Sequence, residues 1–193
     1  MKIDLTVAVT AEILGALAGA TGAGSVPPAA RFGHIGTHFD VMDKEFPLDN
    51  TERRGLIFDV RHVAGRAVEA ADIDAAAVAA ADFVIFHTGW LADKGYAGPE
   101  YFAGHPELST ALITWLTDRR VSMIGIDAPG IRRAAGHAEA DQYCADRGIF
   151  VVENLAGLDA LRREAAGRPF LVHTYPVRYQ GLTGLPCRVV AEL

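Results

Sequence analysis

The stretch DFVIFHTGW, residues 82–90, indicates the fold class most directly. Its centre is a continuous run of large apolar residues, which is typical of a strand buried on both faces of a sheet. A polar turn sequence with a glycine follows at once. The stretch therefore predicts a central β-strand that ends in a loop.

Similar apolar runs recur along the chain and share this β-rich composition. They are residues 3–9, 55–60, 121–128, 148–155, 169–177 and 186–193. Helix-like stretches lie between several of them, at residues 71–81, 106–119, 135–147 and 158–166. Strands that alternate with helices are typical of α/β proteins. We therefore predict an α/β fold in one domain over residues 1–193.

The length and the net charge of the chain limit the classes of function that we expect. A chain of 193 residues suits a single domain, and half of its residues are hydrophobic. The net charge of −6 argues against nucleic acid and anionic membranes as partners. No apolar run reaches the roughly 18 residues that span a bilayer, and the acidic start of the chain does not resemble a signal peptide. We expect a cytoplasmic protein that acts on a small molecule.

Two further features concern local chemistry. Cys144 and Cys187 lie far apart with no Cys-x-x-Cys spacing, so no disulfide framework is expected. The segment GATGAGSVPPAA, residues 19–30, predicts a flexible connection or lid. No glycine-rich nucleotide-binding motif and no Gly-x-Ser-x-Gly motif occurs, which argues against a nucleotide cofactor and a serine hydrolase.

The stretch GHIGTHFDVMDKEFP, residues 33–47, places His34, His38 and Asp40 within seven residues. On a straight helix Asp40 would point away from the two histidines. On an extended segment all three share a face, but about 13 Å separates the histidines. Gly36 lies between them and can form the bulge or turn that brings them together. Imidazoles with a carboxylate suit Zn, Mn or Fe, so the stretch predicts a divalent metal site.

The motif HIGTHFD resembles the signature of the putative cyclase family, which includes bacterial kynurenine formamidases and isatin hydrolases. Further similar stretches follow in the order that the family uses: HTGW at 87–90, GIDAPGI at 125–131, VVENLAGLDAL at 151–161 and GLPCRVVA at 184–191. The resemblance implies a swivelling β/β/α-type fold, with a mixed sheet around a metal site. It also implies a homodimer or higher oligomer and a metal-dependent hydrolase.

The resemblance assigns roles to individual residues. His34, His38 and Asp40 match the ligands of a first metal, and Asp40 could bridge a second one. Glu153 matches a late carboxylate ligand. One or two Zn or Mn ions per chain are therefore expected.

The chain departs from the family pattern at three places. Lys44 stands where the family has a proton-transferring histidine, and it could act as a base only if nearby cations lowered its pKa. Otherwise it is a surface lysine paired with a neighbouring acid. Asp141 stands where the family has a later histidine, with His137 one helical turn earlier as the other candidate ligand. Residues 19–30 contain no Trp or Tyr, so an aromatic substrate such as formylkynurenine is less expected.

Two residues of the HTGW stretch are candidates for binding substrate. His87 ends an apolar strand, where sites commonly open in α/β proteins, but it could equally be a core histidine. Trp90 could line a pocket or belong to the core.

Together these features predict a metal-dependent hydrolase of a small amide, N-acyl or lactone-type substrate, acting on a non-peptide C–N or ester bond. The metal would lower the pKa of bound water from about 15.7 toward 7, the resulting hydroxide would attack the carbonyl, and Lys44 or an acidic neighbour would move the proton. The alternative is a catalytically degenerate binding or regulatory protein that keeps the fold.

Overall fold

The structure is a computed structural model that describes residues 1–13, 33–98 and 100–193. The connection predicted at residues 19–30 lies outside these ranges. The strands are β1 (Lys2–Asp4), β2 (His38–Asp40), β3 (Glu52–Asp59), β4 (Phe83–His87), β5 (Met123–Ile126), β6 (Phe150–Glu153), β7 (Phe170–Pro176) and β8 (Gly184–Glu192). The helices are α3 (Trp90–Lys94), α4 (Thr110–Asp118), α5 (Ala135–Ala145) and α6 (Leu158–Ala165).

All of these strands belong to one mixed sheet. Its order is β1-β8-β2-β6-β5-β4-β3-β7, and β7 also pairs with β8. This additional pairing closes the strands from β8 round to β7 into a barrel, while β1 extends the sheet beyond β8. The strands β3 to β6 are parallel to one another, and the remaining pairs are antiparallel. The α/β class and the mixed sheet are therefore confirmed.

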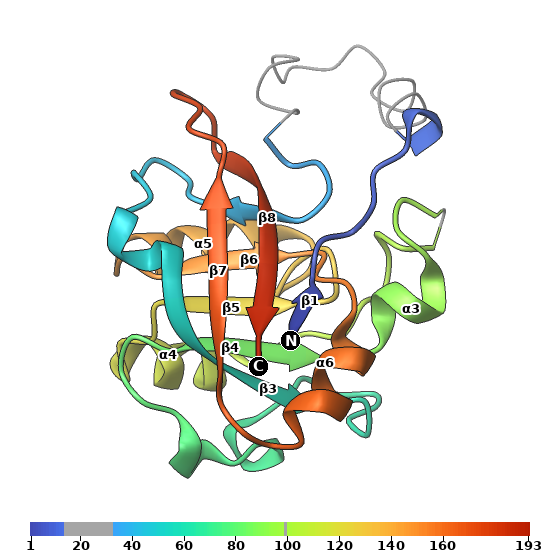
Figure 1. The fold of residues 1–193 in the computed structure, drawn as a ribbon, viewed down its shortest axis with the longest axis vertical. Helices are drawn as coiled ribbons and strands as arrows, with labels where there is room; N and C mark the ends of the chain where they lie inside the picture. The colour runs from blue at the N-terminus through green and yellow to red at the C-terminus, as the bar shows by residue number, and fades with distance from the viewer. Residues whose placement is uncertain (14–32, 99) are drawn as a thin grey trace.

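Two apolar layers bury the central strands from both sides. Figure 1 shows β7 and β8 running across the direction of β4, β5 and β6. Phe83 and Ile85 of β4 face an inner core together with Val172 of β7 and Val189 of β8. The alternate residues of β4 face an outer core with side chains of α4 and α5. Every residue of β4 is buried, which explains its uninterrupted apolar run.

The helix predicted over residues 71–81 is wrong. The structure has two short 3-10 helices in this region, Ala70–Asp72 and Ala75–Ala77. Val78 is the only buried residue between positions 71 and 81. Because helices in proteins are stabilised mainly by packing an apolar face, an alanine-rich stretch with one buried side chain lacks the contacts to hold a long helix.

Three helices were predicted correctly in position, with ends that differ by a few residues. The structure also contains α3, which the sequence patterns did not predict. Among the described residues, no helix combines the length and the apolar character needed to cross a bilayer.

Candidate metal centre

Pairing between β2 and β6 forms the base of the candidate centre. In this antiparallel pair His38 lies opposite Glu153. Phe39 belongs to the inner core, so His38 and Asp40 project to the opposite face of the sheet, as strand alternation requires. Helix α5, which contacts β6, contributes His137 and Asp141 at a spacing of four residues.

The candidate ligands form two groups that share Asp40. The ligand atoms of His34, His38 and Asp40 lie within 4.8 Å of one another, and so do those of Asp40, His137, Asp141 and Glu153. His34 Nδ1 lies 3.0 Å from Asp40 Oδ1 and 3.2 Å from His38 Nε2. A carboxylate that belongs to two adjacent ligand groups is suited to lie between two ions.

Glu153 links the two groups through both of its oxygens. Glu153 Oε2 is 3.4 Å from His38 Nε2, and Glu153 Oε1 is 3.0 Å from His137 Nε2. His137 Nε2 also lies 3.1 Å from Asp141 Oδ2. The sequence left Asp141 and His137 as alternatives, and the structure brings both of them to Glu153 and Asp40.

Two glycines, Gly33 and Gly36, help to set the positions of His34 and His38. Gly36 has a φ of +67°, the conformation expected for the turn between His34 and His38. A Cβ at Gly36 would meet Val9 Cγ2 at 2.8 Å, and one at Gly33 would collide with the backbone of Gly184. The GLPC stretch near the end of the chain therefore packs directly against the loop that carries His34.

The carboxyl groups and imidazoles of this site shift one another's pKa values. Burial raises the pKa of Asp141 to about 7, with the charges of Asp40 and Glu153 adding to the effect. Burial and the Asp40 charge also raise the pKa of Glu153. Burial alone would lower the pKa of His38, but Asp40 and Glu153 bring it to about 9. The close carboxylates of Asp141 and Glu153 raise the pKa of His137 to about 11. The cluster of buried carboxylates therefore favours a positively charged group or ion at this site.

The donor set fits a divalent metal ion. Among the described residues, three buried carboxylate oxygens have no hydrogen-bond partner: Asp40 Oδ2, Asp141 Oδ1 and Glu153 Oε1. Although Glu153 Oε1 lies close to His137, the two atoms are not aligned for a hydrogen bond. Buried oxygens without donors are costly unless something else satisfies them, and a cation would do so. Imidazole and carboxylate ligands together suit Zn, Mn or Fe.

The structure places Lys44 apart from these residues. Its ammonium group lies 2.8 Å from carboxylate oxygens of both Asp43 and Asp146. Hydrogen bonds to Asp146 and Asp43 raise the pKa of Lys44, whereas a general base would need a lowered one. Asp146 directly follows the end of α5, five residues after Asp141, which corresponds to about 7.5 Å along the helix axis. Lys44 therefore matches the alternative of a surface lysine paired with neighbouring acids.

His87 and Trp90 also lie outside the two ligand groups. His87 has the same strand parity as Phe83 and Ile85, so its side chain projects toward the inner side of the sheet, whereas Glu153 projects toward α5. His87 Nε2 lies 3.8 Å from Asp159 and 4.0 Å from Asp127. The indole of Trp90 donates a 2.8 Å hydrogen bond to the carbonyl of Tyr101.

The contact of Trp90 leads to residues that the sequence did not indicate. Tyr101 donates a hydrogen bond to the side chain of Asn154, and the backbone amide of Gly36 donates one to the hydroxyl of Tyr96. Both tyrosines come from the segment after α3, which contains no recognisable motif. The position of Asn154 directly after Glu153 is the one signal that could have pointed to it.

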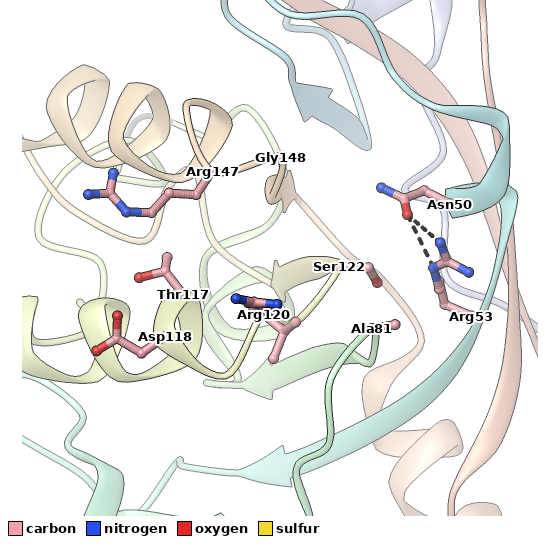
Figure 2. Close-up of a pocket in the computed structure, with 10 residues that line it drawn as sticks. Asn50, Arg53, Ala81, Thr117, Asp118, Arg120, Ser122, Arg147 and Gly148 are labelled. Atoms are coloured by element: carbon pink, nitrogen blue, oxygen red, sulfur yellow. Dashed lines mark hydrogen bonds between the residues drawn. The ribbon is translucent and has the colours of Figure 1, made fainter.

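A cavity of about 540 Å³ lies at the other end of the central strands. Its lining includes Ala81, Ser122 and Gly148, which precede β4, β5 and β6, whereas Glu153 ends β6. Figure 2 shows Arg53 at this cavity, bound to Asn50. The cavity is therefore separate from the candidate metal centre.

Solved structures share this fold. A protein from Bacillus stearothermophilus described as a "predicted metal-dependent hydrolase" is 18% identical with a TM-score of 0.72, over 99% of this chain and 97% of its own. Isatin hydrolase A from Labrenzia aggregata, bound to benzyl benzoate, is 16% identical with a TM-score of 0.75, over 100% and 93%. Isatin hydrolase A from Ralstonia solanacearum is 18% identical with a TM-score of 0.73, over 99% and 91%. Identities this low show a common fold.

Sequence comparison gives the family. No curated protein sequence matches the chain. The family model described as "Putative cyclase" matches residues 3–133, which is more than half of the chain and includes the HIGTHFD motif. The chain therefore belongs to the putative cyclase family.

Proposed function

We propose that this protein is a metal-dependent hydrolase that opens a C–N or ester bond in a small amide, N-acyl or lactone-type substrate. The observation that carries the proposal is the buried Asp40 shared by two ligand groups, with unpartnered carboxylate oxygens around it. The names of the structural neighbours support the same class of reaction.

In this proposal His34, His38, Asp40, Asp141 and Glu153 would hold one or two Zn or Mn ions. A divalent ion bound there would supply a Lewis acid that polarises a carbonyl group and lowers the pKa of water. The strand pairing of β2 with β6 fixes the ligands of these two strands before any ion binds, so little reorganisation is needed.

The exposure of the side chains indicates where substrate enters. Asp40, Asp141, Glu153 and His38 are at most 5% exposed, whereas the side chains of His34 and His137 are 37% and 35% exposed. The site therefore opens to solvent on the side of these two imidazoles, and a small substrate would approach there.

We assign proton transfer to His137 in place of the histidine that Lys44 replaces. Its side chain is 35% exposed at the opening, and its Nε2 is held between Asp141 and Glu153, which would orient the imidazole. These carboxylates raise the pKa of His137 in the metal-free protein, and a divalent ion bound to them would bring it down toward the range of a general base. The variant His137→Gln separates this role from that of a ligand. We expect it to retain metal while turnover falls by about 100-fold or more. Loss of metal would make His137 a ligand instead.

The proposed function is tested by assaying a panel of small N-acyl compounds and lactones with Mn²⁺ or Zn²⁺ supplied. We expect turnover in the wild type, and none in His38→Ala, which lacks a central ligand. Lys44 motivates the second candidate, a binding protein without catalysis, because it stands where the family has a proton-transferring histidine. Metal-loaded wild type that hydrolyses no member of the panel would favour that candidate.

A further inference from the structure

Asn154 is a buried residue with an unusual backbone conformation next to the candidate ligand Glu153. Its φ is +58°, a left-handed value that asparagine tolerates better than most residues other than glycine. Its backbone is held on both sides: the amide donates to the carbonyl of Ala128 at 3.2 Å, and the carbonyl accepts from Thr37 Oγ1 at 2.8 Å. These two hydrogen bonds fix the backbone of Asn154 and therefore the position from which its side chain extends.

The side-chain amide of Asn154 has a partner at each end. Nδ2 donates to the carbonyl of Gly36 at 2.9 Å, and Oδ1 accepts from the Tyr101 hydroxyl at 2.7 Å. Because a backbone carbonyl can only accept, this contact settles which end of the amide carries nitrogen. Tyr101 is fully buried, so its hydrogen bond to Asn154 is shielded from water.

The Gly36 carbonyl also determines the state of His38. It lies 2.9 Å from His38 Nδ1, which must carry the proton in order to donate to it. His38 Nε2 is then the nitrogen available to a metal, and it is the one that lies 3.5 Å from Asp40 and 3.4 Å from Glu153. A hydrogen bond from the distal nitrogen of a ligating histidine to a carbonyl fixes both its tautomer and its orientation.

We propose that Asn154 is a positioning residue for metal binding, which holds the Gly36 carbonyl where it orients His38, and that Tyr101 in turn orients Asn154. The inference rests on the proposed function, because it presumes that His38 binds a metal. It adds a connection from the segment after α3, through Tyr101, Asn154 and Gly36, to a ligand.

The test is titration of chelator-stripped protein with Mn²⁺ alone. Loss of such an outer partner typically weakens metal affinity by about 10- to 100-fold, which is the effect expected for Asn154→Ala. Asn50→Ala is the matched control: Asn50 is also a buried asparagine, but it binds Arg53 at the opposite end of the central strands. Its Mn²⁺ affinity should equal that of the wild type.

Two further measurements separate positioning from a general loss of structure. Tyr101→Phe removes one hydroxyl and should weaken Mn²⁺ binding in the same direction by less, and it tests the proposal even if Asn154→Ala does not fold. In the double variant the two losses should not add, because Tyr101 acts through Asn154. The melting temperature of each metal-free variant is compared with that of Asn50→Ala.

The outcomes distinguish this inference from the proposed function. If the wild type binds Mn²⁺ and either Asn154→Ala or Tyr101→Phe binds it with equal affinity, this inference is overturned while the proposed function stands. An affinity loss that Asn50→Ala reproduces would also overturn it, since destabilisation would then explain the effect. Wild type that binds neither Mn²⁺ nor Zn²⁺ would overturn both proposals.

Discussion

Asp141→Asn should make the metal-free protein more stable and its metal binding weaker. Asp141 is 3% exposed, and burial together with the charges of Asp40 and Glu153 raises its pKa to about 7 from the ordinary 3.8. A carboxyl group whose pKa is higher in the folded state binds more protons there than in the unfolded state. The free energy of unfolding therefore falls as the pH rises from about 4 to 7.

The size of the effect follows from these values. A shift of about three pKa units corresponds to about 4 kcal/mol of destabilisation above pH 7. The pKa of about 7 already includes the 3.1 Å contact of Asp141 with His137, so an uncharged asparagine removes about the whole of this cost. The gain of about 4 kcal/mol should raise the melting temperature of a chain of this size by about 8 to 16 °C.

The assay is urea unfolding followed by circular dichroism, in EDTA at pH 5 and pH 8. The free energy of unfolding of Asp141→Asn should exceed that of the wild type at pH 8, and the difference should be smaller at pH 5. Excess Mn²⁺ should reduce or reverse this difference. Asp82→Asn is the control, because Asp82 is equally buried but accepts a 2.8 Å hydrogen bond from the Ala79 amide and pairs with Arg54. It should be less stable than the wild type at both pH values. A metal-free Asp141→Asn variant that is less stable than the wild type at pH 8 would refute the reasoning.

Three other substitutions have distinct expected results. His38→Ala should lose bound metal, measured by elemental analysis, while its circular dichroism spectrum stays that of the folded protein. Lys44→Met should retain metal and most of its turnover, because Asp43 and Asp146 already engage the ammonium group; a 100-fold loss would return Lys44 to the catalytic site. Burial lowers the pKa of His87 below 6.5, so the unfolded state binds more protons and stability falls below about pH 6.5. His87→Gln should therefore lose less unfolding free energy between pH 7.5 and pH 5.5 than the wild type.

The fold could be predicted where a local pattern and the tertiary contacts agree. The apolar run of β4 corresponds to burial on both faces, so its composition indicates its place in the sheet. The three residues of β2 carry no such signal, because their extended conformation depends on pairing with β6 and β8, which lie far along the chain. The helix prediction for residues 71–81 was wrong for the opposite reason. The composition of this stretch favours a helix, but the structure gives it no buried face that would stabilise one.

The candidate site shows the same division. His34, His38 and Asp40 lie within seven residues, and the turn at Gly36 could be predicted from the glycine alone. The choice between His137 and Asp141 depends on how α5 is rotated above β6, which only the tertiary structure gives. The roles of Asn154 and Tyr101 depend on a contact between residues 53 positions apart, for which the sequence has no local pattern.

The most direct test of the metal centre is the number of metal ions per chain, measured by elemental analysis after Mn²⁺ or Zn²⁺ has been supplied and unbound metal removed. Two ligand groups that share Asp40 predict about two ions in the wild type, falling to about one in Asp141→Asn. A value near zero for the wild type would contradict the proposed hydrolase and its metal centre.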